Sequence, residues 1–67
     1  MKLGNRIKKL REDNKLSQNQ LGAKLGVKFS AVSKWERDET VPPLKQIAKM
    51  IKIFDTTYDE FFEDIDF

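Results

Sequence analysis

The feature that most constrains the fold is a pair of short helical patterns separated by a glycine. In residues 17–37, apolar side chains recur three or four positions apart, the spacing that places them on one face of an α-helix. Gly26 interrupts the pattern, and glycine readily adopts the left-handed conformation that ends a helix. This stretch therefore predicts two helices joined by a tight turn.

The start of the first of these helices is also indicated. Ser17 followed by Gln20 matches a capping box, in which a serine at the N-cap and a glutamine three residues later satisfy free backbone N–H groups. Leu21 and Leu25 then form its buried face, and Gly26 ends it. The second helix follows from Val27 and buries the remaining apolar side chains of the motif. These are Val32 and Trp35.

The same spacing continues through the rest of the chain, without the alternation that predicts strands. We expect a first helix before residue 14, a fourth that begins near Leu44 after Pro43, and a short fifth opened by a second capping box at Thr57 and Glu60. The apolar face predicted for the fourth helix comprises Leu44, Ile47, Ala48, Met50, Ile51 and Phe54. The predicted fold is all-α, a compact five-helix bundle that forms one domain over residues 1–67.

Composition argues against catalysis. The 67-residue chain contains neither cysteine nor histidine, so disulfides, Cys-type zinc sites and the commonest general base are excluded. A chain this short has little room for a deep cleft. Six acidic side chains lie in residues 55–67, but they lack the spacing of a calcium-binding loop and are expected to form a solvated face. We expect no enzymatic activity, no metal and no cofactor.

The chain has no apolar run near the length of about 18 residues that a membrane helix needs, and its start lacks the apolar segment of a signal peptide. We therefore expect a cytoplasmic protein with no membrane partner.

Charge is distributed unevenly along the chain. Residues 1–37 carry ten basic and three acidic side chains, a net charge of +7, whereas residues 38–67 carry three basic and eight acidic side chains, a net charge of −5. Such a division fits one surface that faces a polyanion and another that faces away, although two ordinary solvated faces would give the same pattern.

Two glycines meet the geometric demands of a helix-turn-helix, whose helices cross at a large angle after a turn of a few residues. Gly22 is placed where the helices should approach most closely, despite a cost of about 1 kcal/mol for glycine within a helix. Gly26 supplies the turn residue that tolerates a positive φ. Both requirements are met together with the apolar contacts, which makes the motif far more specific than either glycine alone.

With these residues in place, the chain resembles the lambda-repressor-like, Cro-type helix-turn-helix domains of phage and bacterial regulators. The matching segments span nearly the whole chain: IKKLR (7–11), LSQ (16–18), LGV (25–27), VSKWER (32–37), PL (43–44), IAK (47–49) and YDEFF (58–62). The resemblance implies binding to operator DNA, usually as a two-fold dimer, with the third helix, about residues 28–37, in the major groove.

The resemblance also implies roles for individual residues. Gln18 corresponds to a glutamine that meets a phosphate at the start of the second helix, where free N–H groups and the helix dipole favour an anion. Glu36 corresponds to a glutamate that pairs with an arginine of the first helix, here Arg11, as a structural ion pair. The full set of expected DNA-binding residues is Gln18, Asn19, Lys28, Phe29, Ser30, Ser33, Lys34 and Arg37.

The chemistry of readout can be argued from the side chains. Lys34 can donate to guanine O6 and N7, and Phe29 can contact a thymine methyl group. Ser30 and Ser33 can donate or accept and carry little base preference alone. For Phe29 the alternative is packing onto the end of the second helix or into a dimer contact.

Several positions depart from the pattern of the family. Lys28 replaces the usual serine or threonine cap of the third helix and cannot accept from backbone N–H groups. Ser30 is the alternative cap, which would shift the start of the helix. Asp38 and Asp55 replace common glycines, and Asp38 and Glu39 bring negative charge close to where related loops touch phosphates.

The C-terminal segment carries more apolar side chains than so small a core needs. The candidate dimer interface consists of Ile53, Tyr58, Phe62, Ile65 and Phe67, and the alternative is that they close the core. The leading hypothesis is a dimeric transcriptional regulator, a repressor, on a palindromic operator. The alternatives are an antitoxin-type module whose acidic C-terminus binds a protein partner, and the N-terminal DNA-binding domain of a longer regulator.

Overall fold

The computed structural model describes all 67 residues, and they form five α-helices and no strand. The helices are α1 (Leu3–Asp13), α2 (Gln18–Leu25), α3 (Phe29–Glu36), α4 (Leu44–Ile53) and α5 (Tyr58–Phe62). The predicted all-α bundle, with a helix-turn-helix formed by the second and third helices, is confirmed. None of the five is long and apolar enough to cross a membrane.

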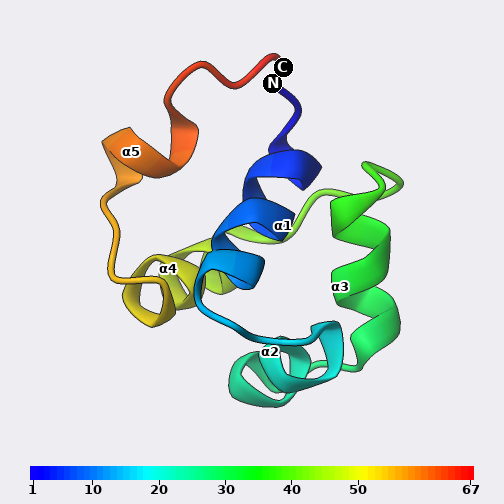
Figure 1. Ribbon diagram of the computed structural model, residues 1–67. Coiled ribbons are helices and arrows are strands. Elements are labelled where there is room, and N and C mark those ends of the chain that lie inside the picture. The colour runs from blue at the N-terminus through cyan, green and yellow to red at the C-terminus, as the bar shows by residue number, and fades with distance from the viewer.

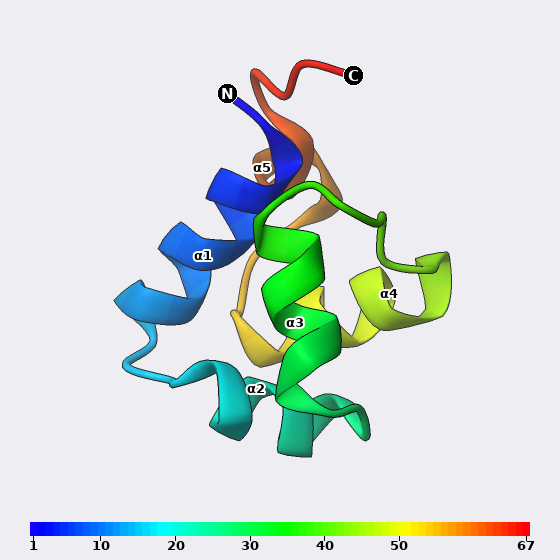
Figure 2. The same ribbon diagram turned by 90° about the vertical axis from the view of Figure 1, so that its right-hand side faces the viewer.

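The helices leave one side of α3 uncovered. In Figure 1, α1 runs through the middle, α2 lies at its lower end, α3 stands on the right, and α4 and α5 lie on the left. Figure 2, turned by 90°, looks directly onto α3, with α2 below it and α1 and α4 to either side. The outer face of α3 is therefore open along its length.

Eleven buried apolar side chains from all five helices and the segment after α4 form a single core. They are Leu3, Ile7, Leu21, Leu25, Val32, Trp35, Ile47, Met50, Ile51, Phe54 and Phe61. Phe61 is fully buried, so the short α5 closes one end of this core. The prediction for Leu44 was wrong, because its side chain is 72% exposed. Leu44 is the first residue of α4, where the chain enters from a loop and no other helix covers it, and Pro42 is buried instead.

The two predicted capping boxes differ in outcome. At α2 the box is complete: Ser17 Oγ accepts from Gln20 N–H at 3.0 Å, and Ser17 N–H donates to Gln20 Oε1 at 2.8 Å. At α5 only half of it forms, since Thr57 Oγ1 accepts from Glu60 N–H at 3.1 Å. The Glu60 carboxylate accepts from the Thr57 hydroxyl group rather than from the Thr57 backbone.

Aspartates take the left-handed conformation at the two positions where they replace glycine. Asp38 has φ 59° and Asp55 has φ 53°. The Asp38 carboxylate also accepts from Gly4 N–H at 3.0 Å, at the open start of α1. A Cβ atom at Gly4 would lie 2.4 Å from the carbonyl oxygen of Glu36, so glycine is required where α1 meets the end of α3.

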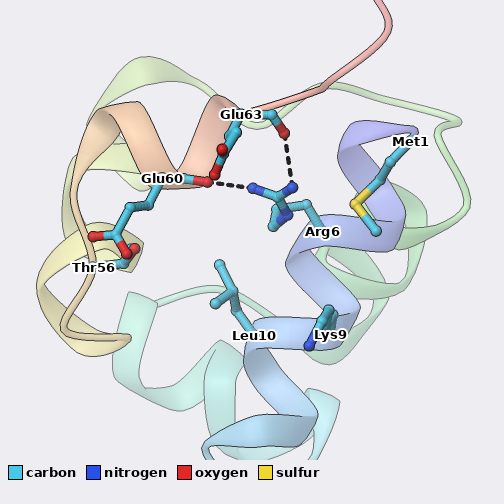
Figure 3. A pocket seen from close by; sticks show the side chains of 7 residues that line it. All are labelled: Met1, Arg6, Lys9, Leu10, Thr56, Glu60 and Glu63. Carbon is cyan, nitrogen blue, oxygen red and sulfur yellow. Dashed lines mark hydrogen bonds between the residues drawn. The ribbon is translucent and has the colours of Figure 1, made fainter.

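Arg6 holds α5 against α1. Its guanidinium group reaches from α1 to the end of α5, where it donates to the carbonyl oxygens of Phe61 at 3.0 Å and Glu63 at 2.8 Å and also to that of Glu60. Figure 3 shows the hydrogen bonds to Glu60 and Glu63. The last carbonyl groups of a helix lack intrahelical partners, so this cation satisfies them and opposes their negative dipole end. No sequence pattern indicated this role.

Candidate nucleic-acid interface

The turn between α2 and α3 is built on its two glycines. Gly26 has φ 75°, and Val27 N–H donates to the Gly22 carbonyl oxygen at 2.9 Å. A Cβ atom at Gly22 would lie 2.7 Å from the carbonyl oxygen of Val27. The close approach at Gly22 is therefore to the backbone of the turn and reaches the start of α3, since the Lys28 carbonyl carbon would lie at 3.3 Å and Phe29 N at 3.4 Å. These contacts fix the angle at which α3 leaves α2.

α3 divides its side chains between the core and solvent. Val32, Trp35 and Glu36 are buried. The predicted contact residues lie on the other side: Lys28, Phe29, Ser30, Lys34 and Arg37 are exposed, and Ser33 is half-buried. This outer face is the one turned toward the viewer in Figure 2.

The start of α3 is settled by the backbone at Lys28. This residue is the N-cap, with extended backbone at φ −77° and ψ 155° and no side-chain cap hydrogen bond. The helix begins at Phe29, so the alternative start with Ser30 as the cap is wrong. Phe29 is 56% exposed and does not enter the core.

The start of α2 leaves backbone donors free on the same side of the motif. Ser17 satisfies two N–H groups, accepting at Oγ from Gln20 and at its carbonyl oxygen from Leu21. The N–H groups of Gln18 and Asn19 are the remaining two of the first turn, which have no partner within an α-helix. Asn19 is exposed and Gln18 half-buried.

The structure brings Arg11 and Glu36 together as a two-pronged ion pair. Arg11 Nε donates to Glu36 Oε2 at 2.6 Å, and Arg11 Nη2 donates to Glu36 Oε1 at 3.0 Å. Only 11% of the Arg11 side chain and 4% of that of Glu36 are exposed. The hydrogen bond to Glu36 raises the pKa of Arg11 above its ordinary value, against the opposing effect of burial.

Two features of this surface had no signal in the sequence. Gln18 Nε2 donates to Glu36 Oε1 at 3.1 Å, a contact between residues 18 positions apart. Arg37 Nε forms an exposed ion pair with Glu39 at 2.5 Å, so its charge is locally balanced. Lys28 and Lys34 form no ion pair within the chain.

The candidate dimer residues fall into two groups. Ile53, Phe62 and Ile65 are half-buried and pack against the core. Tyr58 is 48% exposed and Phe67 93% exposed, and the Phe67 ring lies 6.0 Å from that of Phe62. Most of the segment therefore closes the core, and two aromatic side chains remain on the surface.

The helix-turn-helix family model matches residues 7–61 of this chain. The chain belongs to the helix-turn-helix family. Its fold is close to that of the P22 c2 repressor, in a crystal structure with a synthetic operator, at a TM-score of 0.84 and 32% identity over 94% of this chain and 96% of the repressor chain. The resemblance seen in the sequence is thereby confirmed.

Two curated transcriptional regulators of the family are also similar. The regulator PuuR of Escherichia coli (strain K12) is 30% identical over 91% of this chain, and the activator BcrR of Enterococcus faecalis is 33% identical over 90% of it. The chain spans only 33% of the length of PuuR and 29% of that of BcrR. The similarity therefore says nothing about the functions of the parts of PuuR and BcrR that lie outside the matched region.

Proposed function

We propose that this chain binds double-stranded DNA in a sequence-specific manner and regulates transcription, with α3 in the major groove. The observation that carries the proposal is the outer face of α3, where exposed donors and one apolar ring take no part in the fold. The similarity to a repressor that was solved with a synthetic operator supports binding to DNA.

Base readout is assigned to the exposed face of α3. The major groove, about 12 Å wide, admits one helix and displays a distinct pattern for each base pair. Lys34, which has no acidic partner, donates to guanine O6 and N7. Phe29 contacts a thymine methyl group, and the hydroxyl groups of Ser30 and Ser33 add adaptable hydrogen bonds.

Phosphate contacts are assigned to the edges of the same surface. The free N–H groups at the start of α2, with the side chains of Gln18 and Asn19, suit one phosphate. Lys28 at the turn and Arg37 after α3 are placed to contact other phosphates. The ion pair with Glu39 partly offsets the attraction of Arg37 for a phosphate. Such contacts fix the register of α3 on the duplex without reading sequence.

The functional unit is proposed to be a homodimer that acts as a repressor on a palindromic operator in the cytoplasm. Half-sites on one face of DNA lie about 34–36 Å apart. The longest dimension of this chain is 27 Å, so one copy cannot reach two half-sites. Tyr58 and Phe67, over the half-buried Ile53, Phe62 and Ile65, are the proposed contact between copies.

Selection of bound sequences from a random duplex pool tests this proposal. Enrichment of a palindrome with half-sites one helical turn apart is the expected result and establishes both specificity and dimer geometry. Flat enrichment with a steep dependence on salt would instead show binding to the DNA backbone alone and would contradict sequence-specific regulation.

The second candidate is the DNA-binding part of a longer regulator, and the short share of PuuR and BcrR that the chain spans favours it. An antitoxin-type module would use the same DNA surface and bind a protein through its acidic C-terminal segment. Purification from the native host separates these two functions. A covalently longer product supports the longer regulator, and a small basic protein that copurifies supports the antitoxin-type module.

A further inference from the structure

A single carboxylate joins three helices beside the proposed DNA surface. Glu36 is the last residue of α3, and its two oxygens accept from Arg11, which belongs to the last turn of α1. Glu36 Oε1 also accepts from Nε2 of Gln18, the first residue of α2. Gln18, whose side chain is proposed to contact a phosphate, is thus hydrogen-bonded to α3, the helix that is proposed to contact the bases.

The position of Glu36 is unfavourable for its own helix. A carboxylate at the end of α3 faces the negative end of the helix dipole, and its side chain is almost fully removed from water. Arg11 compensates for this burial. Replacing a buried ion pair by apolar residues of similar volume often leaves the folded state as stable or more stable. Stability alone therefore does not explain why Arg11 and Glu36 form a buried ion pair.

The hydrogen bond to Glu36 determines how the Gln18 amide is oriented. An ionised carboxylate only accepts hydrogen bonds, so the NH2 end of Gln18 must face Glu36 and its carbonyl oxygen must face away. One N–H of the amide is used in this contact and the second remains available. Ordering a long side chain during binding has an entropic cost, which is smaller when the side chain is ordered beforehand.

We propose that Glu36, held in place by Arg11, is a positioning residue for DNA binding. Its carboxylate fixes the Gln18 amide so that the remaining N–H meets a phosphate without further ordering. This rests on the proposed function. Because Glu36 belongs to α3, its hydrogen bond with Gln18 also fixes the position of α3 relative to the phosphate that Gln18 contacts. Contacts with phosphates determine the register of a protein on the duplex in this way.

The first test needs no DNA. NMR order parameters of side-chain NH2 groups in the free protein report motion on the ps–ns timescale. Gln18 is expected to be as ordered as Gln20, whose side chain is held in the capping box, and more ordered than the exposed Asn19. A Gln18 side chain as mobile as that of Asn19 would overturn the inference, whatever the protein does with DNA.

The second test is a mutant cycle in a background without the carboxylate. The double variant Arg11→Met with Glu36→Met removes both charges together, a replacement that often preserves a fold. The probe is a mixed-sequence duplex of about 20 base pairs in about 50 mM salt, because phosphate contacts are independent of sequence. Thermal melting by circular dichroism establishes that each variant is folded.

Gln18→Ala is expected to weaken binding about fivefold to tenfold in the native background, which lies within the range for the net contribution of one hydrogen bond. In the Met background the same change is expected to weaken it by less than about twofold. Asn19→Ala is the matched control, whose effect should be equal in both backgrounds because the hydrogen bonds of the Glu36 carboxylate come from Arg11 and Gln18 and not from Asn19.

The outcomes separate the inference from the function on which it rests. Equal losses for Gln18→Ala in the two backgrounds would overturn the positioning role while DNA binding stands. A native chain that binds no duplex at low salt would overturn the proposed function and the inference together. If the Met background does not melt cooperatively, the order parameter of Gln18 decides.

Discussion

At the residue scale, Lys34 and Phe29 represent the two kinds of side chain on the outer face of α3. One is a cation free of any ion pair, and the other is an apolar ring left in solvent. Neither contributes to the core, so truncating either should leave the fold intact. Surface changes of this kind usually alter the free energy of unfolding by less than about 0.5 kcal/mol.

Lys34→Ala is therefore expected to relax base preference at one position of each half-site. The predicted loss of discrimination is about 1–3 kcal/mol, the value of one good base contact. Binding titrations on the selected duplex and on single-base variants measure it. Lys8→Ala, a change on an exposed residue of α1, is the control. Unchanged preference in Lys34→Ala would remove this residue from the reading face.

The buried ion pair leads to a different prediction. Glu36→Ala leaves the Arg11 guanidinium group without its partner at a site where only 11% of its side chain is exposed. We expect the free energy of unfolding to fall by about 3 kcal/mol, as measured by urea denaturation. Arg11→Met with Glu36→Met should cost much less, because it leaves no unpaired charge. If the single and double changes cost the same, the pair does not act as a unit.

At the scale of elements, the turn between α2 and α3 depends on the left-handed conformation of Gly26. Nothing lies within 4 Å of the position that a Cβ atom would take, so a side chain meets no neighbour there. The only penalty is conformational, since L-residues pay about 1–2 kcal/mol in this region.

Gly26→Ala is thus expected to lower the free energy of unfolding by about 1 kcal/mol in urea denaturation. Gly26→Asn should cost less, because asparagine tolerates this conformation better than alanine. A cost well above about 2 kcal/mol for alanine would show that the side chain meets an obstruction and that conformation alone is not the cause.

The ends of the helices show which structural features a local sequence pattern predicts and which it does not. The glycine at the turn and the capping box at Ser17 were readable because each depends on residues within a few positions. The start of α3 at Phe29 was ambiguous, since Lys28 supplies no side-chain cap. The exposure of Leu44 was mispredicted because helical spacing specifies a face and not whether another helix covers it.

At the scale of the whole molecule, the two ends of the chain meet (Figure 1). The Met1 ammonium group donates to Asp66 Oδ2 at 2.9 Å, and Asp66 N–H donates to the Met1 carbonyl oxygen at 2.8 Å. The hydrogen bond and the charge of the ammonium group lower the pKa of the Asp66 carboxyl group below its ordinary value.

A carboxyl group whose pKa is lower in the folded state stabilises that state above its ordinary pKa, and the effect disappears as pH falls through the lowered value. The melting temperature of the native chain should therefore be higher than that of the Asp66→Asn variant at about pH 7. At about pH 2 the two melting temperatures should be equal. The difference is small because the pair is exposed. Acetylation of Met1 should remove it at neutral pH, and a difference that survives acetylation would contradict the assignment.

The sequence by itself determined the five helices, the tight turn at Gly26 and the division of α3 into a buried and an exposed face. These follow from spacing and from backbone preferences that act over a few residues. Tertiary structure alone decided which side chains meet across helices: Arg6 with the end of α5, and Gln18 with Glu36. The physical reason is that helical periodicity specifies which way a side chain points, whereas its partner depends on how separate helices pack.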